Sequence, residues 1–470
     1  MTQASANIAG GWLDLGTRTG VDWRLYAPLP VEDGEEPELD SVHSKDLSPV
    51  SHYSRIPFPL KTSGPNKDVT AQFAKTADFA GNTSWNFVTP DIRIKAAQVD
   101  NYRIAMTSNL GHHVAHQVQF VAQEVPLVKF DAVTMDLLSE INLGAGQYEG
   151  YMRDIGNVPK LLNFSDHLPP TEISVLLHPL FFVQKNKSCP QDNFPLCAAK
   201  HNTFSLNIAF IESYEQVIRI QKNTAANPGV DAAVWVDENP KNVNLSDIVD
   251  VVGSQGLAFQ IPQIWCEYAL VHGDERDSFK AESFDLAIKT IQPFTGPKVT
   301  AGACRQALKF AGPSRYIAFA ARNQTALEKH SYANYSTVAE DENDDAAIDP
   351  VQKVTLWYDS TPRIQNMPGS HFARMEFLLH AARSTFKNGV HLLPYTEDTT
   401  SSELDCTTNM SKLTSELELL ISESNPDTDV AATSPCSYTM EVRSEGLSVI
   451  RLSGGVIEFP HFVKPEGISD

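Results

Sequence analysis

The chain has 470 residues, 42% of them hydrophobic, and its mass of 51.8 kDa fits about two domains. This composition excludes an intrinsically disordered chain, and the lack of any run of about eighteen apolar residues argues against a membrane-spanning helix. The formal charge is -21, from 58 acidic and 37 basic residues, and no basic cluster interrupts the acidic balance. Direct nucleic-acid binding is therefore not expected.

The first segment, residues 1–50, is predicted to be an amino-terminal arm or anchor. It lacks the basic and apolar regions of a signal peptide, so we expect no export by that route. Residues 28–47 are acidic and contain prolines, which is typical of an exposed loop.

Residues 51–225 are predicted to form a first β-sandwich. Within it, residues 203–211 alternate between apolar and small or polar side chains, which is the period of a half-buried strand. Residues 130–143 instead carry apolar side chains at helical spacing, including Val133, Leu137 and Ile141, and predict a short helix.

The sequence loosens at residues 226–254, where Asn, Pro and Gly cluster, and we predict a linker there. Residues 255–470 are predicted to form a second β-sandwich of similar size. Its expected strands are 264–270, 315–319, 354–358, 417–421 and 449–452, with a helix within 274–291 and acidic loops at 341–345 and 425–435.

Many short strands and few helical stripes together predict an all-β chain of jelly-roll sandwiches, with short helical excursions in loops. The adjacent glycines Gly454 and Gly455 are expected to form a tight turn with positive φ, because glycine adopts that conformation without steric cost. A β-branched residue at either position should then impair assembly.

Three histidines, His112, His113 and His116, raise the question of a metal site, since histidines spaced by three or four residues converge on one helix face. However, Val114, Val118 and Phe120 share one parity and predict a strand. In a strand His112 and His116 are about 13 Å apart, at roughly 3.3 Å per residue. We therefore predict that these histidines do not share a metal.

The other candidate sites also favour structural interpretations. Residues 144–150 are glycine-rich but follow a predicted helix and have the wrong glycine spacing for a dinucleotide loop, so we expect a flexible turn. The acidic pairs Asp344 and Asp345, and Glu416 and Glu418, are interpreted as solvated surface and not as acid-base pairs. No nucleophile elbow, HExxH motif or Walker loop is present, and we predict no catalytic, cofactor-binding or metal-binding residue.

Six cysteines form no CxxC pair, which argues against a disulfide scaffold or a zinc ribbon and favours a reduced environment. Cys189 and Cys197 lie in a proline-containing segment and are expected to pack rather than to react. Asn-x-Ser/Thr sequons are expected to stay unused in a cytoplasmic assembly site; they occur at Asn82, Asn163, Asn244, Asn323, Asn334 and Asn409.

A series of short motifs in collinear order resembles the major capsid proteins of large DNA viruses, in particular those of iridoviruses and marseilleviruses. The motif at residues 151–158 (Tyr-Met-Arg-Asp-Ile-Gly-Asn-Val) is distinctive, and the closing strand pair at 446–460 is similar to that of the family. The remaining matching segments are 11–17, 25–26, 103–104, 109–112, 130–131, 178–182, 204–208, 268–271, 274–276 and 349–356.

The resemblance implies a double jelly roll that builds a capsid and has no enzymatic activity. Three copies would form a pseudo-hexagonal capsomer that tiles a large icosahedral shell, because six similar barrels around a threefold axis approximate sixfold symmetry. It further implies assembly in the host cytoplasm, a location in the virion, and contacts with minor capsid and penton proteins and with proteins of an internal membrane.

Two alternatives stay open. A minor capsid paralogue or a scaffold protein shares the double barrel. A jelly-roll carbohydrate-binding protein or glycan-processing enzyme shares the sandwich, and would show an exposed aromatic platform or a cleft with convergent carboxylates.

Overall fold

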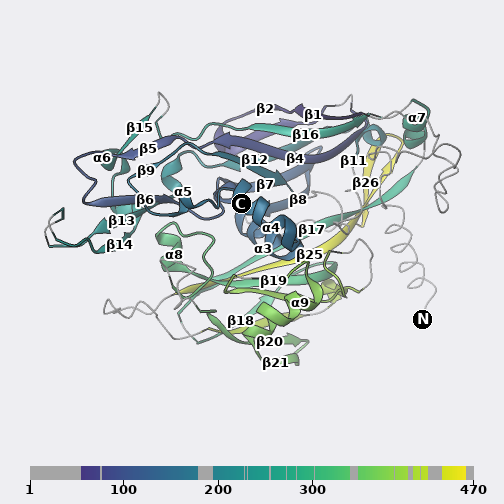
Figure 1. Ribbon diagram of the computed structural model, residues 1–470. Coiled ribbons are helices and arrows are strands. Elements are labelled where there is room, and N and C mark those ends of the chain that lie inside the picture. The colour runs from purple at the N-terminus through teal and green to yellow at the C-terminus, as the bar shows by residue number, and fades with distance from the viewer. Residues whose placement is uncertain are drawn as a thin grey trace, which may run out of the picture.

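The computed structural model describes residues 54–461, apart from 75–76, 178–193, 227, 230, 253–255, 271–272, 282, 301, 339–347, 386, 401–405, 413 and 422–436. Antiparallel strands dominate these ranges, and two similar halves stack on one another (Figure 1). The predicted arm 1–50, the acidic loops 341–345 and 425–435, and Cys189 lie outside the described residues.

The first half contains two facing sheets. Sheet A has the strand order β1 (Ser54–Pro59), β16 (Gln263–Leu270), β4 (Phe79–Val88) and β10 (Glu172–Leu177), with β11 (Phe194–Pro195) also paired to β4. Sheet B has the order β2 (Lys61–Ser63), β3 (Val69–Gln72), β12 (Phe204–Phe210), β7 (Ala115–Ala122) and β8 (Val125–Asp131).

Two small sheets extend one end of the first half. One joins β14 (Trp235–Glu238), β13 (Ile218–Asn223) and β6 (Tyr102–Met106); the other joins β15 (Val249–Val252), β5 (Asp91–Ile94) and β9 (His167–Leu168).

The second half repeats the arrangement of the two large sheets. Sheet F has the order β17 (Phe284–Val299), β25 (Tyr438–Ser453), β19 (Pro313–Asn323) and β22 (Val390–Pro394), with β26 (Val456–His461) on β25 and β23 (Thr408–Asn409) on β19. Sheet G has the order β18 (Gly302–Leu308), β24 (Ser415–Ile421), β20 (Val351–Tyr358) and β21 (Thr361–Pro368).

Helices are short and lie in the connections. The α-helices are α2 (Leu110–His113), α3 (Ala132–Asn142), α4 (Ala145–Asp154), α5 (Pro159–Leu162), α6 (Leu245–Ile248), α7 (Gly273–Ala281), α8 (Gln324–Glu328) and α9 (Glu376–His380). Single tighter or wider turns are η2 (Asn66–Asp68), η3 (Leu196–Ala199), η4 (Tyr214–Gln216), η5 (Pro240–Asn242), η6 (His371–Met375) and η7 (Met410–Lys412).

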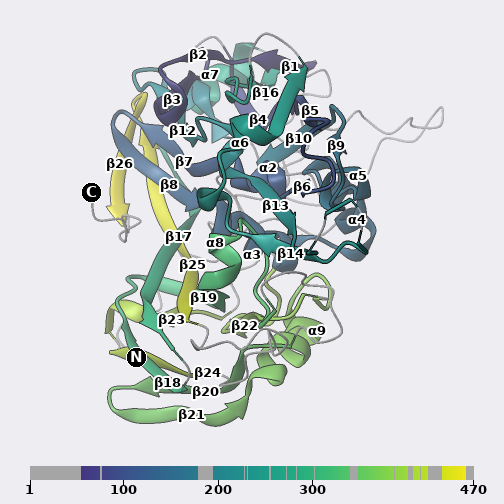
Figure 2. The same cartoon turned by 90° about the vertical axis from the view of Figure 1, so that its left-hand side faces the viewer.

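The topologies of the two halves correspond. In sheets A and F the first and last long strands of the half are neighbours, followed by two strands from its middle. The edge strand β8 of sheet B leads into α3, and the edge strand β21 of sheet G leads into η6 and α9. The fold is thus the predicted double jelly roll. Its layers run in the order A, B, F and G, with α3 between B and F in both ribbon views (Figures 1 and 2).

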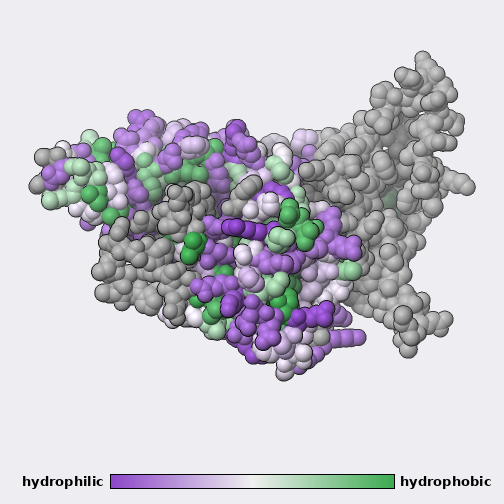
Figure 3. All heavy atoms as spheres, turned by 60° about the horizontal axis from the view of Figure 1, so that its bottom comes forward, coloured by the Kyte–Doolittle hydropathy of each residue, from purple (hydrophilic) through white to green (hydrophobic). Residues whose placement is uncertain are grey.

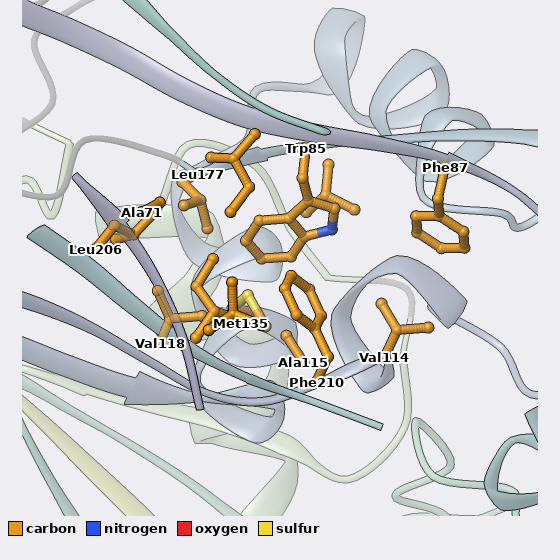
Figure 4. Packing of buried hydrophobic residues seen from close by; sticks show 14 of the residues in the cluster. Ala71, Trp85, Phe87, Val114, Ala115, Val118, Met135, Leu177, Leu206 and Phe210 are labelled. Carbon is orange, nitrogen blue, oxygen red and sulfur yellow. The ribbon is translucent and has the colours of Figure 1, made fainter. Parts of the chain in front are cut away.

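Two large apolar cores fill the sandwiches, and the first continues onto Ile288, Ile450 and Ile457 of the second half. In the first half, Trp85 of β4 is fully buried and meets Phe210 of β12 edge to face, with ring centroids 5.6 Å apart (Figure 4). The alternation of β12 points Phe204, Leu206 and Ile208 into this core, which confirms the predicted strand. The second core lies between sheets F and G.

The predicted strands described above and the helix at 130–143 are confirmed, whereas the predictions for 274–291 and 144–150 need correction. The helix expected at 130–143 is α3. Of the stretch 274–291, only the part up to Ala281 is helical, because Phe284 begins β17, a strand of sixteen residues that pairs with β25. Residues 144–150, expected as a flexible turn, belong to α4, where Met152 is buried and Tyr148 and Tyr151 pack against the core.

The strand pairing bears on where the halves divide. The segment 226–254, predicted as a linker, contains β14 and β15, which pair with β13 and β5 of the first half. The next strand, β16, lies between β1 and β4 in sheet A. We therefore propose a boundary between β16 and β17, later than the one expected from composition.

Candidate functional site

Helix α3 lies at the contact between the two halves. Asp131 caps its first turn, because the carboxylate accepts hydrogen bonds from the backbone N–H of Thr134 at 2.8 Å and from its hydroxyl at 2.6 Å. The apolar stripe of α3, formed by Val133, Leu137 and Ile141, packs with residues of β19 and β22 on the outer face of sheet F. The helix thus belongs to the first half in sequence but covers a sheet of the second.

Three acidic groups of this helix bind partners on other elements. The first, Asp131, accepts a hydrogen bond from Nη2 of Arg443 in β25 at 2.7 Å. The same guanidinium contacts Glu441 at 3.1 Å and the Thr134 hydroxyl at 3.0 Å, and its side chain is 4% exposed. One buried cation therefore links the start of α3 to sheet F.

The second acidic group, Asp136, is fully enclosed. Its carboxylate lies 2.7 Å from Nδ1 of His112 and 3.1 Å from Nε2 of His113, and it accepts from the Asn109 amide at 2.7 Å. The hydroxyl of Tyr335, from the second half, donates to it at 3.2 Å. The carboxylate thus joins three groups of the α2 turn to a tyrosine of the other half.

The third acidic group, Glu140, pairs with Arg383 in a buried contact between the halves. It also accepts hydrogen bonds from the hydroxyls of Tyr148 at 2.7 Å and Thr385 at 3.0 Å. The guanidinium of Arg383 lies 3.5 Å from the centre of the Tyr148 ring, a cation–π contact.

A fourth buried carboxylate, Glu445 of β25, lies within sheet F. It accepts a hydrogen bond from the Tyr316 hydroxyl at 2.7 Å and pairs with Lys289 and Arg315, both at 3.3 Å. Burial lowers the pKa of Lys289, although the charge of Glu445 acts in the opposite direction. We call the groups around Asp131, Asp136, Glu140 and Glu445 the buried polar layer.

The electrostatics of this layer favour a structural role. Burial raises the pKa of the Asp131 carboxyl, but the Arg443 guanidinium and the Thr134 hydrogen bonds offset this, so that its pKa is lowered overall. For Asp136, interactions with His113 and His112 overcome the effect of burial and hold the pKa well below its usual range. Burial lowers the pKa of His113, although the charge of Asp136 acts in the opposite direction. Saturated, water-excluded carboxylates of this kind hold elements together and present no acceptor to a substrate.

The candidate histidines do not all lie on the expected strand, and two of them contact the same carboxylate, that of Asp136. His112 and His113 lie in the short helix α2, not in the expected strand, because the chain turns at Asn109 with φ 51°. A Cβ on Gly111 would lie 2.6 Å from Val175, so this turn packs closely against β10. His116 is the second residue of β7 and lies on the surface, where its Nε2 is 3.4 Å from Oε1 of Gln216. In the described part of the chain, no group of three or more His, Cys, Asp or Glu residues is arranged to hold a metal ion.

The remaining candidates have ordinary partners. Glu416 pairs with Arg305, and Glu418 accepts from the Trp357 indole at 3.3 Å, both on the outer face of sheet G. Cys197 is buried in η3. Asp344 and Asp345 lie outside the described residues.

Two of the sequons cannot be reached in the folded chain. Asn323 and Asn334 are buried, and their amides donate to the carbonyls of Thr337 at 3.1 Å and Val338 at 2.7 Å. The other four belong to the partly or fully exposed surface, in β4, beside α5 and α6, and in β23.

Sequence reasoning found α3 but missed the polar layer. The signal was present, since Arg315 interrupts an apolar strand and Glu140 lies within an apolar helical stripe. What the sequence lacks is the pairing: Glu140 and Arg383 are 243 residues apart, and Asp131 and Arg443 are 312 apart.

No helix in the described ranges is both long and apolar enough to cross a membrane. Residues 275–458 match the family model described as large eukaryotic DNA virus major capsid protein. The major capsid protein of Tipula iridescent virus is 22% identical over 488 residues, covering 97% of this chain and 98% of that protein. That of Frog virus 3 is 21% identical over 437 residues, covering 87% of each.

Solved structures show the same fold. A chain of the PBCV-1 virus capsid has a TM-score of 0.63 at 14% identity, covering 88% of this chain and 98% of that one. The Faustovirus major capsid protein has a TM-score of 0.60 at 9% identity, covering 96% and 98%. The chain is therefore similar, over nearly its whole length, to the major capsid proteins of large DNA viruses, and it has a double jelly-roll fold.

Proposed function

We propose that this chain is the major building block of an icosahedral capsid and that three copies form a pseudo-hexagonal capsomer. The observation that carries the proposal is the stack of two topologically equivalent halves, A–B and F–G, which the buried polar layer joins. Three such chains supply six similar halves, and a closed ring needs only one kind of contact between copies.

We further propose that these capsomers contact one another in the shell, together with minor capsid and penton proteins and proteins of an underlying membrane. Assembly would take place in the host cytoplasm. The charge of -21 supports a role without nucleic-acid contact. The protein would act without catalysis, cofactor or metal.

A minor double-barrel capsid protein or a scaffold protein remains the alternative, because it would share the fold and differ in copy number. A carbohydrate-binding role is less well supported, because the half-exposed tryptophans in the described part of the chain, Trp235, Trp265 and Trp357, lie on three different sheets and form no joint platform.

The test is the mass of the purified chain by light scattering at neutral pH over a concentration series. We expect about three times 51.8 kDa. A monomer at every concentration would contradict the capsomer proposal, and a glycan screen would then test the binding alternative.

A further inference from the structure

The contact inside the chain supplies a template for a contact between chains. Helix α3, which follows the edge strand β8 of sheet B, covers the outer face of sheet F with Val133, Leu137 and Ile141. In the second half, η6 and α9 follow the edge strand β21 of sheet G and are thus the topological equivalent of α3. The equivalent of sheet F is sheet A.

The helix equivalent to α3 exposes apolar side chains. Met375 is 48% exposed, Leu378 64% and Leu379 63%, whereas Phe377 between them is buried. We call Met375, Leu378 and Leu379 the α9 patch. Arg374 beside the patch and Arg363 on β21 are exposed as well. Apolar residues exposed together next to polar ones mark contact surfaces in soluble proteins. Figure 3 turns the bottom of Figure 1 toward the viewer and shows hydrophobic residues among the hydrophilic ones on this side.

The face equivalent to the covered face of sheet F is the outer face of sheet A. Asn86 and Gln263 are exposed on it, Val88 is 60% exposed, and a shallow hollow surrounds half-exposed Trp265. The hollow is lined by Pro57, Asn82, Ser84, Asn86, Leu176 and Glu267. The charged side chains that the structure describes on this face are the two carboxylates Glu172 and Glu267. A central aromatic residue with few charges is the composition of an interface core.

We propose that the α9 patch and the adjoining side of sheet G of one copy pack on the outer face of sheet A of the next copy, around Trp265, as α3 packs on sheet F within the chain. This proposal rests on the proposed capsomer and names its contact surfaces. Sheets A and G lie at opposite sides of the stack in both ribbon views, so each copy offers one surface of each kind (Figures 1 and 2). Such head-to-tail contacts form a ring when the rotation between copies closes. The carboxylates Glu172 and Glu267 on sheet A are opposite in charge to the exposed Arg363 and Arg374.

Three arginine substitutions test the assignment. Ser84→Arg places a bulky cation in the hollow of sheet A, and Leu378→Arg places one in the α9 patch. Val234→Arg is the control, because Val234 is 54% exposed and belongs to neither surface. We expect Ser84→Arg and Leu378→Arg to be folded monomers by light scattering and circular dichroism, at concentrations where wild type and Val234→Arg are trimers.

Mixing the two monomeric variants tests the pairing itself. Ser84→Arg keeps an intact α9 patch, and Leu378→Arg keeps an intact sheet A face, so one productive contact remains per pair. We expect a 1:1 heterodimer near twice 51.8 kDa and no trimer. The absence of association between the two variants would refute the pairing. A dimer formed by either variant alone would also refute it, because it would show a contact between like faces.

The outcomes separate this inference from the proposed function. If wild type and both variants are all trimers, the capsomer stands and the assignment of its surfaces is wrong. If wild type is a monomer throughout, both are wrong.

Discussion

Arg443 provides the sharpest test of the buried polar layer, because the same strand carries a matched control. Both Arg443 and Arg451 lie on β25, and each makes ion pairs with acidic side chains. The Arg443 side chain is 4% exposed, whereas that of Arg451, paired with Asp285, is 44% exposed. The perturbation is Arg443→Met, which keeps the aliphatic stem and removes the charge.

Loss of Arg443 leaves Asp131 and Glu441 as carboxylates without their shared cation, and it removes the bond to the Thr134 hydroxyl. Removing one partner of a buried ion pair typically costs about 3–5 kcal/mol, because the other charge stays buried without compensation. We expect Arg443→Met to lower the free energy of unfolding by that amount. Arg451→Met should change it little, since water screens an exposed pair.

The assay is urea unfolding of wild type and both variants, followed by tryptophan fluorescence at one protein concentration, because subunit association shifts the apparent stability. A midpoint for Arg443→Met that coincides with that of Arg451→Met would refute the reasoning. It would mean that Arg443 contributes no more between the halves than an arginine at the surface.

Three further predictions concern the turn, the acid limit and the core. Gly454 and Gly455 have φ values of 60° and 83°, but an added Cβ would contact a neighbouring side chain within 4 Å only at Gly455. Gly455→Ala should therefore lower the midpoint of thermal unfolding more than Gly454→Ala does. The pKa values of Asp131 and Asp136 are lowered, so the stability that these carboxylates contribute is complete above the ordinary carboxyl pKa of 3.8 and is lost as the pH falls below it. An acid titration followed by circular dichroism should therefore show unfolding below about pH 4 and not between pH 5 and 8. Trp85→Ala should cost about 3–5 kcal/mol in urea unfolding, because it leaves a cavity in the first core, and a loss below about 1 kcal/mol would contradict the packing.

The strands were predictable wherever one face is buried and the other is not. In β24, Leu417, Leu419 and Ile421 point inward and Glu416 and Glu418 point outward, so the period of two is visible in the sequence itself. Helix α3 was predictable for the same reason at helical spacing. Such patterns depend only on the local direction of side chains, which each type of element fixes.

Elements that depend on distant packing were predicted wrongly. The glycines of α4 give it low helix propensity, and the helix forms because Tyr148, Tyr151 and Met152 contact the core. The α2 turn depends on the close approach of Gly111 to Val175, 64 residues further along the chain. Local pattern cannot show either contact.

The buried polar layer can define the angle between the two halves, which apolar packing alone does not. Apolar contact is not directional, and the Val133, Leu137 and Ile141 stripe could rest on sheet F at several angles. The three acidic groups Asp131, Asp136 and Glu140 are each satisfied by a specific partner from the second half, which selects one angle. In the proposed ring of six halves an error in that angle would recur in every copy, so such a ring would close only if the angle is well defined. Buried ion pairs often add little net stability, and we infer that here they are retained because they fix the angle. If so, Arg443→Met should impair trimer formation even at urea concentrations far below its unfolding midpoint.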